Sequence, residues 1–202
     1  MIITLKIPRV NFNERLPHEI RLFTEEDLQE FFSQGAVITK KRKEYFMVLH
    51  YRRISIECPV LLMDDGRYQV IWPSFKLPHR PYPAFVYLYA VAWYLSSGET
   101  QRVTAEKVIK LFGLETFAHT TISRFLRALY ITLPYLIQYG ARIIKDWEGG
   151  VSVVVRRKHW NQAQYEKAKQ LIRLIDPALR SPPNFGNWLA YEYWHDTNSF
   201  LV

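Results

Sequence analysis

The segment from Ala84 to Leu95 is the feature that most restricts the fold of this chain. It is apolar almost all round, so a helix formed there has no face suited to water. The run is also only about half the length that a membrane span requires. A helix of this kind must lie at the centre of a globular unit, covered by its neighbours. The sequence therefore predicts a bundle of helices around residues 84–95.

Four prolines precede this segment, at positions 73, 78, 81 and 83. Proline fixes its own backbone and restricts the residue before it, so residues 73–83 are expected to form a rigid, extended connector. The predicted organisation is an N-terminal module over residues 1–72, this connector, and a helix-turn-helix domain over residues 84–202 that also holds a hairpin and C-terminal helices.

The N-terminal module is expected to combine one helix with β-hairpins. Thr24 is followed by three acidic residues, which is typical of a helix start, and Gly35 can end that helix. Aromatic and β-branched residues recur from 44 to 63 and indicate two or three strands. Asp64-Asp65-Gly66 is a turn sequence leading into a strand over 68–72. The whole chain is thus expected to be mainly α with a small β region, an α+β fold.

Two further helices follow the apolar one. Thr104 is expected to cap a helix that Gly113 ends, and a third helix is expected to start near His119 or Thr120. Three consecutive helices, of which the second is short and ends in glycine, are typical of a helix-turn-helix. Pro134 is expected to break or restart the third helix.

The third helix has a polar face opposite its apolar stripe. Short hydroxyls and arginines suit a helix in the DNA major groove, because arginine can bond a guanine edge through two donors and threonine can contact a thymine methyl. Lys107 and Lys110 on the second helix could contact phosphates. A solvated basic face would show the same periodicity. The predicted recognition residues are Thr120, Thr121, Ser123, Arg124 and Arg127.

A hairpin is predicted over residues 142–157. Two β-branched runs, 142–145 and 151–155, flank a turn sequence that contains Gly149-Gly150. Such a hairpin could act as a wing whose basic residues, Arg156, Arg157 and Lys158, contact the DNA backbone. Beyond it, residues 161–164 resemble a capping box that opens a helix to residue 175, and the aromatic tail 184–202 is expected to form a last short helix.

The positive charge of the chain is concentrated in two blocks. The net charge is +8. Residues 36–58 hold six basic and two acidic side chains, and residues 100–160 hold ten and four, while the remainder is balanced or slightly negative. Local excess of one sign is typical of a nucleic-acid footprint. A generally basic protein without such a footprint is the alternative.

Few residues point to other chemistry. The single cysteine, Cys58, excludes a disulfide framework and fits a reducing compartment. With His50 it falls short of the four ligands of a structural zinc site. No phosphate-binding glycine loop and no catalytic set stands out, so we expect no enzyme, no metal and no cofactor. The first residues lack the pattern of a signal peptide, so a soluble, cytoplasmic protein away from membranes is expected.

A resemblance to a known family adds to these expectations. The runs Trp72-Pro73-Ser74-Phe75 and 77–82 (LPHRPY), with 108–114 (VIKLFGL) and 121–127 (TISRFLR), resemble a bacterial family of small proteins, often associated with transposons, that pair a cysteine-rich, zinc-ribbon-like strand region with a helix-turn-helix. The resemblance covers roughly residues 45–130 and implies DNA binding linked to mobile elements. Met63-Asp64-Asp65 stands where the family has cysteines, so no zinc role is implied.

Three functions remain open at this point. The first is a double-stranded DNA-binding protein of the helix-turn-helix type, acting as a transposon accessory protein or regulator. The second is the DNA-recognition part of a transposase or recombinase whose catalytic domain is missing or separate. The third is a non-catalytic assembly subunit that holds its partners through the aromatic tail. Double-stranded DNA is the expected partner, with a second copy of the chain or a transposition protein as further candidates.

Overall fold

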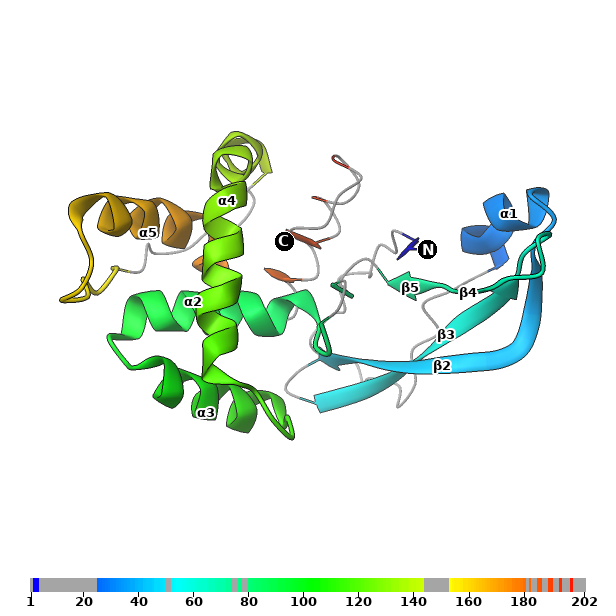
Figure 1. Cartoon of the computed structure of the whole chain (residues 1–202), viewed down its shortest axis with the longest axis horizontal. Coiled ribbons are helices and arrows are strands. Elements are labelled where there is room, and N and C mark those ends of the chain that lie inside the picture. Colours follow the sequence, from blue (N-terminus) through cyan, green and yellow to red (C-terminus); the bar gives the residue numbers. More distant parts are fainter. Residues whose placement is uncertain are drawn as a thin grey trace. The chain divides into compact units, whose positions relative to one another are not determined.

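A computed structural model describes residues 2–3, 25–49, 52–73, 76–77, 80–143 and 153–180, together with positions 182, 185–186, 189–190, 193 and 197. The described chain is mainly helical and includes a three-stranded antiparallel sheet, which confirms the α+β prediction (Figure 1). It divides into two compact units. The strand unit comprises Met1–Pro83 and Asn187–Phe200, and the helical unit comprises Ala84–Gly186 and Leu201–Val202.

The strand unit is built on a long antiparallel pair. Strands β2 (Val37–Leu49) and β3 (Arg52–Leu62) pair along their length, and β4 (Tyr68–Val70) adds to β3. The short strands β1 (Ile2–Ile3) and β5 (Trp72–Pro73) pair in parallel. Strand β2 begins well before the expected residue 44, so the basic run at 40–43 lies inside a strand.

Two predicted turns of this unit are confirmed. The amide of Gly66 donates to the Met63 carbonyl at 2.9 Å in the turn between β3 and β4. Gly35 follows helix α1 (Glu25–Ser33) with a φ of 81°, and a Cβ there would lie 2.1 Å from Asp64 Oδ1. The left-handed φ favours glycine at this position, and any side chain there would also have to displace the exposed Asp64 carboxylate.

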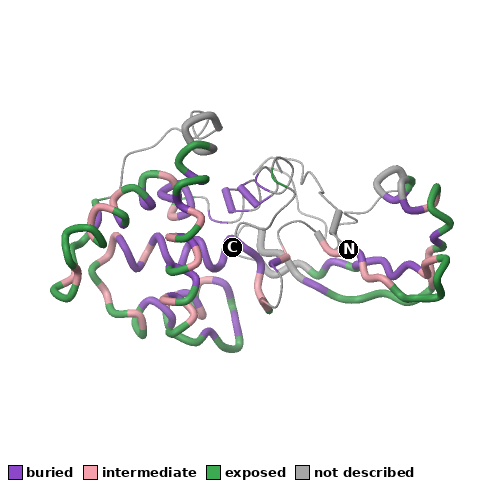
Figure 2. The backbone as a smooth tube through the Cα atoms, turned by 45° about the horizontal axis from the view of Figure 1, so that its top comes forward, coloured by how far each residue is buried: buried purple, intermediate pink, exposed green. Residues whose placement is uncertain are grey.

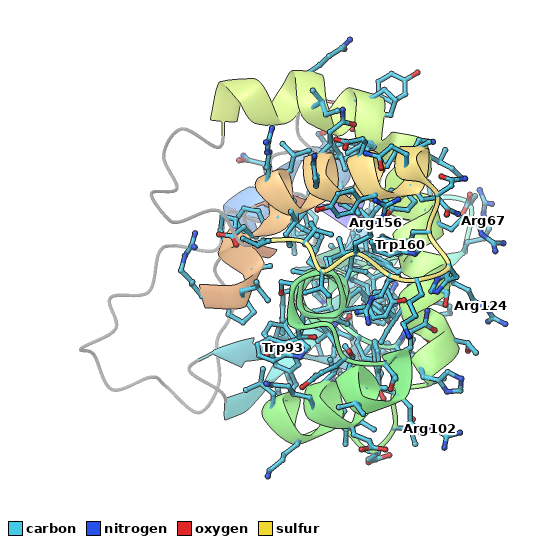
Figure 3. The ribbon with its side chains drawn as sticks, turned by 90° about the vertical axis from the view of Figure 1, so that its left-hand side faces the viewer. Arg67, Trp93, Arg102, Arg124, Arg156 and Trp160 are labelled. Atoms are coloured by element: carbon cyan, nitrogen blue, oxygen red, sulfur yellow. The ribbon has the colours of Figure 1, made fainter. Side chains whose placement is uncertain are left out.

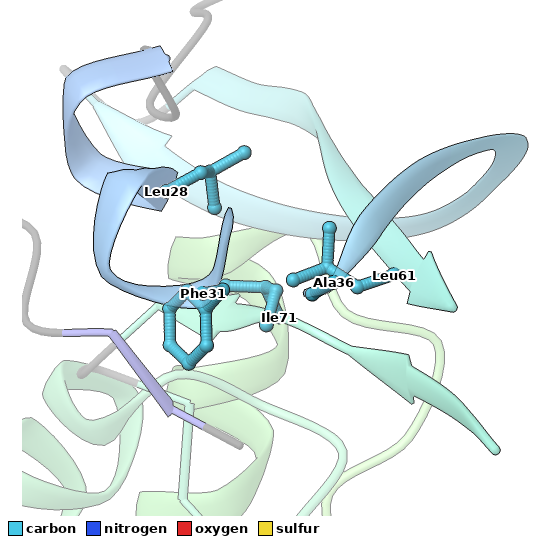
Figure 4. Packing of buried hydrophobic residues seen from close by; sticks show 5 residues of the cluster. All are labelled: Leu28, Phe31, Ala36, Leu61 and Ile71. Atoms are coloured by element: carbon cyan, nitrogen blue, oxygen red, sulfur yellow. The ribbon is translucent and has the colours of Figure 1, made fainter. Parts of the chain in front are cut away.

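Helix α1 and the sheet share a small hydrophobic core. The side chains that form it come from the helix, from the loop after it and from β3, together with the residue that precedes β5, and Figure 4 shows them packed together. They are Leu28, Phe31, Ala36, Leu61 and Ile71, of which Leu61 and Ile71 are fully buried. A helix of nine residues is marginal by itself, so the burial of these side chains stabilises α1 on the sheet.

The helical unit surrounds α2 (Ala84–Ser97), as its apolar sequence predicts. Nearly all of its residues are buried (Figure 2). Four helices contact it: α3 (Gln101–Phe112), α4 (His119–Ile143), α5 (Gln162–Ile175) and α6 (Pro177–Arg180). Figure 1 shows α4 crossing α2, with α3 and α5 on opposite sides of α2.

Aromatic rings join α2 to its neighbours. Tyr87 stacks on Phe125 of α4 with 5.0 Å between ring centroids, and Phe85 meets Phe112 of α3 edge to face at 5.6 Å. Such pairs contribute about 0.5–1.5 kcal/mol each beyond the area that they bury. A Cβ on Gly186 would lie 2.3 Å from Cβ of Phe85, so the chain after α6 also packs directly against α2.

The start of α3 differs from the prediction. Thr100, not Thr104, is the N-cap: its backbone is extended and its side chain accepts a hydrogen bond from the Val103 amide. Thr104 is fully buried one turn inside the helix. The expected end is confirmed, because Gly113 adopts a left-handed φ of 60° and donates to the Ile109 carbonyl.

The expected break at Pro134 is wrong, because α4 continues through it to Ile143. The proline ring lies on the exposed side of the helix. Its missing amide removes one helical hydrogen bond, but Leu133 and Leu136 on either side of it are buried and hold the helix against its neighbours.

The first strand of the expected hairpin is also wrong, since Arg142 and Ile143 lie in α4. Residues 144–152 lie outside the described part of the chain. Residues 153–157 belong to no strand, and the amide of Val155 donates to the Leu95 carbonyl at the end of α2. Packing of this segment against the helix end replaces strand pairing there.

The capping box before α5 is confirmed. The Asn161 side chain accepts from the Gln164 amide at 2.9 Å, and the Gln164 side chain accepts from the Asn161 amide at 3.0 Å. In the aromatic tail, the residues that the structure describes are helical, and the Thr197 hydroxyl donates to the Tyr193 carbonyl. The rest of the predicted tail helix lies outside the described residues.

Candidate nucleic-acid interface

A direct side-chain bond fixes α3 against α4. The hydroxyl of Ser123 donates to Oε1 of Gln101 at 2.7 Å, which joins the first residue of α3 to the second turn of α4. Residues 113–118 connect the two helices, and Leu114 and Phe117 within this turn are buried. The long turn is therefore anchored to the core and holds the two helices in one arrangement.

The described part of α4 has the two faces that its sequence predicts. Ile122, Phe125 and Leu129 are buried, and Phe125 is among the largest fully buried side chains. Thr120, Arg124 and Arg127 are exposed on the opposite side, at the spacing i, i+4, i+7. Two other predicted recognition residues lie beside this face: Thr121 and Ser123 are half-buried, and the Ser123 hydroxyl is already bonded to Gln101.

Five described arginines of the helical unit differ in whether they have partners. Arg157 and Arg180 donate hydrogen bonds to acceptors of the protein itself. Arg102, Arg124 and Arg127 are exposed and form no hydrogen bond or ion pair with any residue that the structure describes. A guanidinium carries five donors, so these three side chains hold a large unused capacity for binding anions or base edges.

Arg102 was missed from the sequence because α3 was expected to begin after it. The cap at Thr100 places Arg102 in the first turn of α3 instead. It follows Gln101 as Arg124 follows Ser123, so the Gln101–Ser123 bond brings the two arginines to one region. Figure 3 shows both side chains extending from the same edge of the helical unit. The signal in the sequence was Thr100, which lies four residues before Thr104, the cap that we expected.

The two predicted phosphate-binding lysines of α3 differ in environment. The ammonium of Lys107 lies 3.2 Å from the centre of the Trp93 ring of α2, and Trp93 Nε1 donates to Glu99 Oε2 at 2.6 Å. Lys107 therefore faces α2. Lys110 is exposed and has no partner among the described residues.

The basic run after residue 155 alternates between outward and inward side chains. Arg157 donates from Nη1 to the Gly98 carbonyl at 2.6 Å and from Nη2 to the Tyr94 carbonyl, and its guanidinium carbon lies 4.2 Å from the centre of the Tyr94 ring. Arg156 is exposed beside Tyr165, and Lys158 is exposed. Figure 3 shows Arg156 on this segment, just before α5. The donors of Arg157 would have to leave α2 to reach a phosphate.

Other chemistry has little support in the described residues. No group of three or more His, Cys, Asp or Glu side chains within them could hold a metal ion. Burial raises the pKa of the Cys58 thiol to about 12, so it stays protonated at neutral pH. No helix of the described chain is long and apolar enough to cross a bilayer.

Comparison with known protein families, with curated protein sequences and with solved structures finds no match to this chain. Its own residues and their geometry are therefore the basis for assigning a function.

Proposed function

We propose that the helical unit binds double-stranded DNA as a helix-turn-helix, with the first half of α4 in the major groove. The carrying observation is the group of exposed arginines, Arg102, Arg124 and Arg127, which have no partner among the residues that the structure describes. The major groove admits one helix, and an arginine there can bond the O6 and N7 atoms of a guanine through two donors. Thr120 on the same face can contact a thymine methyl.

The dimensions of the exposed face fit this role. From Thr120 to Arg127 the axis of α4 advances roughly 10 Å, which corresponds to about three base pairs at about 3.4 Å each. Arg124 lies near the helix start, the part of a recognition helix that usually reaches base edges. Arg124 and Arg127 are thus proposed to read sequence, and Arg102 to contact the flanking backbone.

Phosphate contacts from neighbouring segments complete the proposal. Lys110 on α3, with Arg156 and Lys158 before α5, presents exposed charge that can neutralise phosphates without reading sequence. Lys107 and Arg157 are held by Trp93 and by the end of α2. We propose that these two residues mainly stabilise the helical bundle and do not bind phosphates.

The experiment is a selection of bound sequences from a random duplex pool, followed by affinity measurements on the selected and on random duplexes. Arg124→Ala should cost about 1–3 kcal/mol on the selected site and much less on random DNA. Lys110→Ala should weaken both alike. Lys167→Ala on the exposed side of α5 is the charge-matched control, since Lys167 also has no partner in the described chain.

Two results would contradict the proposal. Equal loss on selected and random duplexes in Arg124→Ala, with unchanged thermal melting, would place α4 along the backbone instead of in the groove. A pool in which no sequence is enriched would remove sequence recognition altogether.

The biological setting rests on the resemblance of residues 45–130 to transposon-associated proteins. We propose an accessory or regulatory role at mobile elements, in which case the selected sequence should recur at the ends or in the control region of such an element. Cleavage of duplex DNA by the isolated chain in the presence of Mg²⁺ would contradict this role, and equally that of a transposase recognition part whose catalytic domain is separate.

A further inference from the structure

Four of the six basic residues in the block at 36–58 lie on an irregular part of strand β2. Lys40, Lys41, Arg42 and Lys43 are consecutive and all exposed, and Figure 2 shows a long exposed stretch of β2. The ladder to β3 shifts here: Ile38 pairs with Leu61 and Arg42 with Pro59. Three residues of β2, 39–41, thus stand opposite Val60 alone, which makes this stretch a β-bulge with two extra residues. We call residues 39–43 the β2 bulge.

Side chains of the bulge hold it in one conformation. The Thr39 hydroxyl donates to the Val60 carbonyl at 2.8 Å and accepts from the Lys41 amide at 3.2 Å. Arg42 donates from Nη1 to the carbonyls of Thr39 and Lys41, at 2.6 and 2.9 Å. These bonds cross the irregular stretch and replace the ladder bonds that it lacks, so the bulge has a defined shape.

The four cations of the bulge divide in the same way as the arginines of the helical unit. The ammonium of Lys41 lies 3.9 Å from the centre of the Tyr68 ring, and Arg42 is bonded to the backbone. Lys40 and Lys43 have no partner in the described chain, and no carboxylate there forms an ion pair with any of the four. Two cations therefore shape the surface, and two remain available to bind an anion.

A regular strand would send consecutive side chains to opposite faces, two cations on each. A bulge interrupts this alternation and re-aims the side chains around it. On extended backbone, Lys40 and Lys43 lie up to roughly 10 Å apart along the strand. One DNA strand places about three phosphate charges along that length of helix axis, so the two ammonium groups can reach separate phosphates.

We propose that the β2 bulge is a second DNA-contact surface, which binds backbone phosphates through Lys40 and Lys43 and reads no sequence. The choice of DNA as the polyanion rests on the proposed function of α4, whereas the surface itself lies in the other unit of the chain. Lysine is a compact point charge without a fork of fixed donors, which suits neutralisation of phosphates rather than recognition of base edges.

The test measures how the affinity for a random 30-base-pair duplex depends on salt. The variant Lys40→Ala/Lys43→Ala keeps the residues that hold the bulge, and Lys167→Ala/Arg173→Ala, which removes two exposed charges of α5, is its matched control. The slope of log K against log salt should fall by about 0.9 for each lost phosphate contact, so by up to about 1.8 in the first variant. The control variant should have the same slope as the parent protein. Lys40→Gln/Lys43→Gln should repeat the result with side chains of similar length.

The outcomes separate this inference from the proposed function. An unchanged slope in both bulge variants, while Arg124→Ala still relaxes sequence preference, would overturn the second surface alone. A lowered slope in the bulge variants with no effect of Arg124→Ala would overturn the role of α4 and leave the second surface standing. Vesicles that contain phosphatidylserine provide a further arm: lost vesicle binding with unchanged duplex binding would assign the bulge to a membrane and overturn the proposal.

Discussion

Replacing Arg157 by alanine is expected to destabilise the helical unit while leaving the DNA-contact face of α4 intact. The side chain donates two hydrogen bonds to carbonyls at the C-terminal end of α2, those of Tyr94 and Gly98, and lies over the Tyr94 ring. The last carbonyls of a helix have no partner within it and carry the negative end of its dipole. Arg157 thus supplies both the missing donors and a favourable charge.

The size of the effect follows from these contacts. Hydrogen bonds that involve a charged group contribute about 1.5–3 kcal/mol each, and a cation over an aromatic ring in a partly exposed place contributes about 0.5–1 kcal/mol. Because contacts made by one side chain do not add fully, we expect Arg157→Ala to lower the free energy of unfolding by about 2–4 kcal/mol. Arg157→Lys keeps the charge but cannot reach both carbonyls, and should recover about 1 kcal/mol.

Urea unfolding of the parent protein and of three variants measures the prediction. Arg156→Ala is the matched control, because Arg156 is the neighbouring arginine but is exposed, and its guanidinium carbon lies 5.4 Å from the centre of the Tyr165 ring. This variant should change the free energy of unfolding by less than about 0.5 kcal/mol. Duplex affinity, measured well below the unfolding midpoint, should be little changed in Arg157→Ala. Parental stability with markedly weaker duplex binding would refute this reasoning and make Arg157 a DNA-contact residue.

Three further predictions concern single positions. Gly186→Ala should lower stability by about 1–3 kcal/mol in urea unfolding, because its Cβ would lie 2.3 Å from Cβ of Phe85; a parental midpoint would mean that the two segments separate freely. Glu44 and Glu57 are paired directly across β2 and β3 and both are exposed. Glu57→Gln should therefore raise the free energy of unfolding by about 0.2–1 kcal/mol, and a lower free energy of unfolding would show that the pair is not repulsive. Burial raises the pKa of Cys58 from 9.0 to about 12. The stability that the protonated, buried thiol contributes is therefore complete below pH 9 and is lost as the pH rises from 9 towards 12. By pH 10 the free energy of unfolding of the parent should fall by about 1.4 kcal/mol more than that of Cys58→Ala. If the two proteins lose stability with pH in parallel, the pKa of Cys58 is not raised.

The sequence predicts best where one pattern decides the outcome. A segment that is apolar on all sides can only be central, and α2 is central. The spacing of Ile122, Phe125 and Leu129 identifies the buried side of α4, and so the exposed side with Arg124 and Arg127. In both cases the partition between water and the core settles the structure without knowledge of distant neighbours.

Prediction fails where local preference and tertiary packing disagree. Thr100 and Thr104 are equally good caps by composition, but the core takes up Thr104 and leaves the earlier threonine at the helix start. Pro134 is a helix breaker by propensity, yet buried leucines on both sides keep α4 continuous. Arg142 and Ile143 belong to a β-branched run that suits a strand, but they continue a helix that is already formed.

The partners of charged side chains were beyond the reach of the sequence. Arg157 and Arg124 stand in similar basic surroundings, but the carbonyls that hold Arg157 lie 59 and 63 residues away along the chain. Thr39 likewise reaches Val60, which lies 21 residues away. Whether a cation supports the fold or stays available for a ligand is set by contacts of this range, which periodicity does not encode.

The central position of α2 has a consequence for synthesis of the chain. The helices that contact it, α3 to α6, and the close contact at Gly186 all belong to segments made later. About ninety residues separate the end of α2 from that contact, and at roughly 5–20 residues per second the ribosome needs about 4–18 s to make them. Throughout this interval the most apolar segment of the nascent protein lacks part of its final cover. Chaperones that bind apolar segments therefore have their longest opportunity to bind at α2. Variants in which the contact at Gly186 forms more slowly should stay bound to such chaperones for longer.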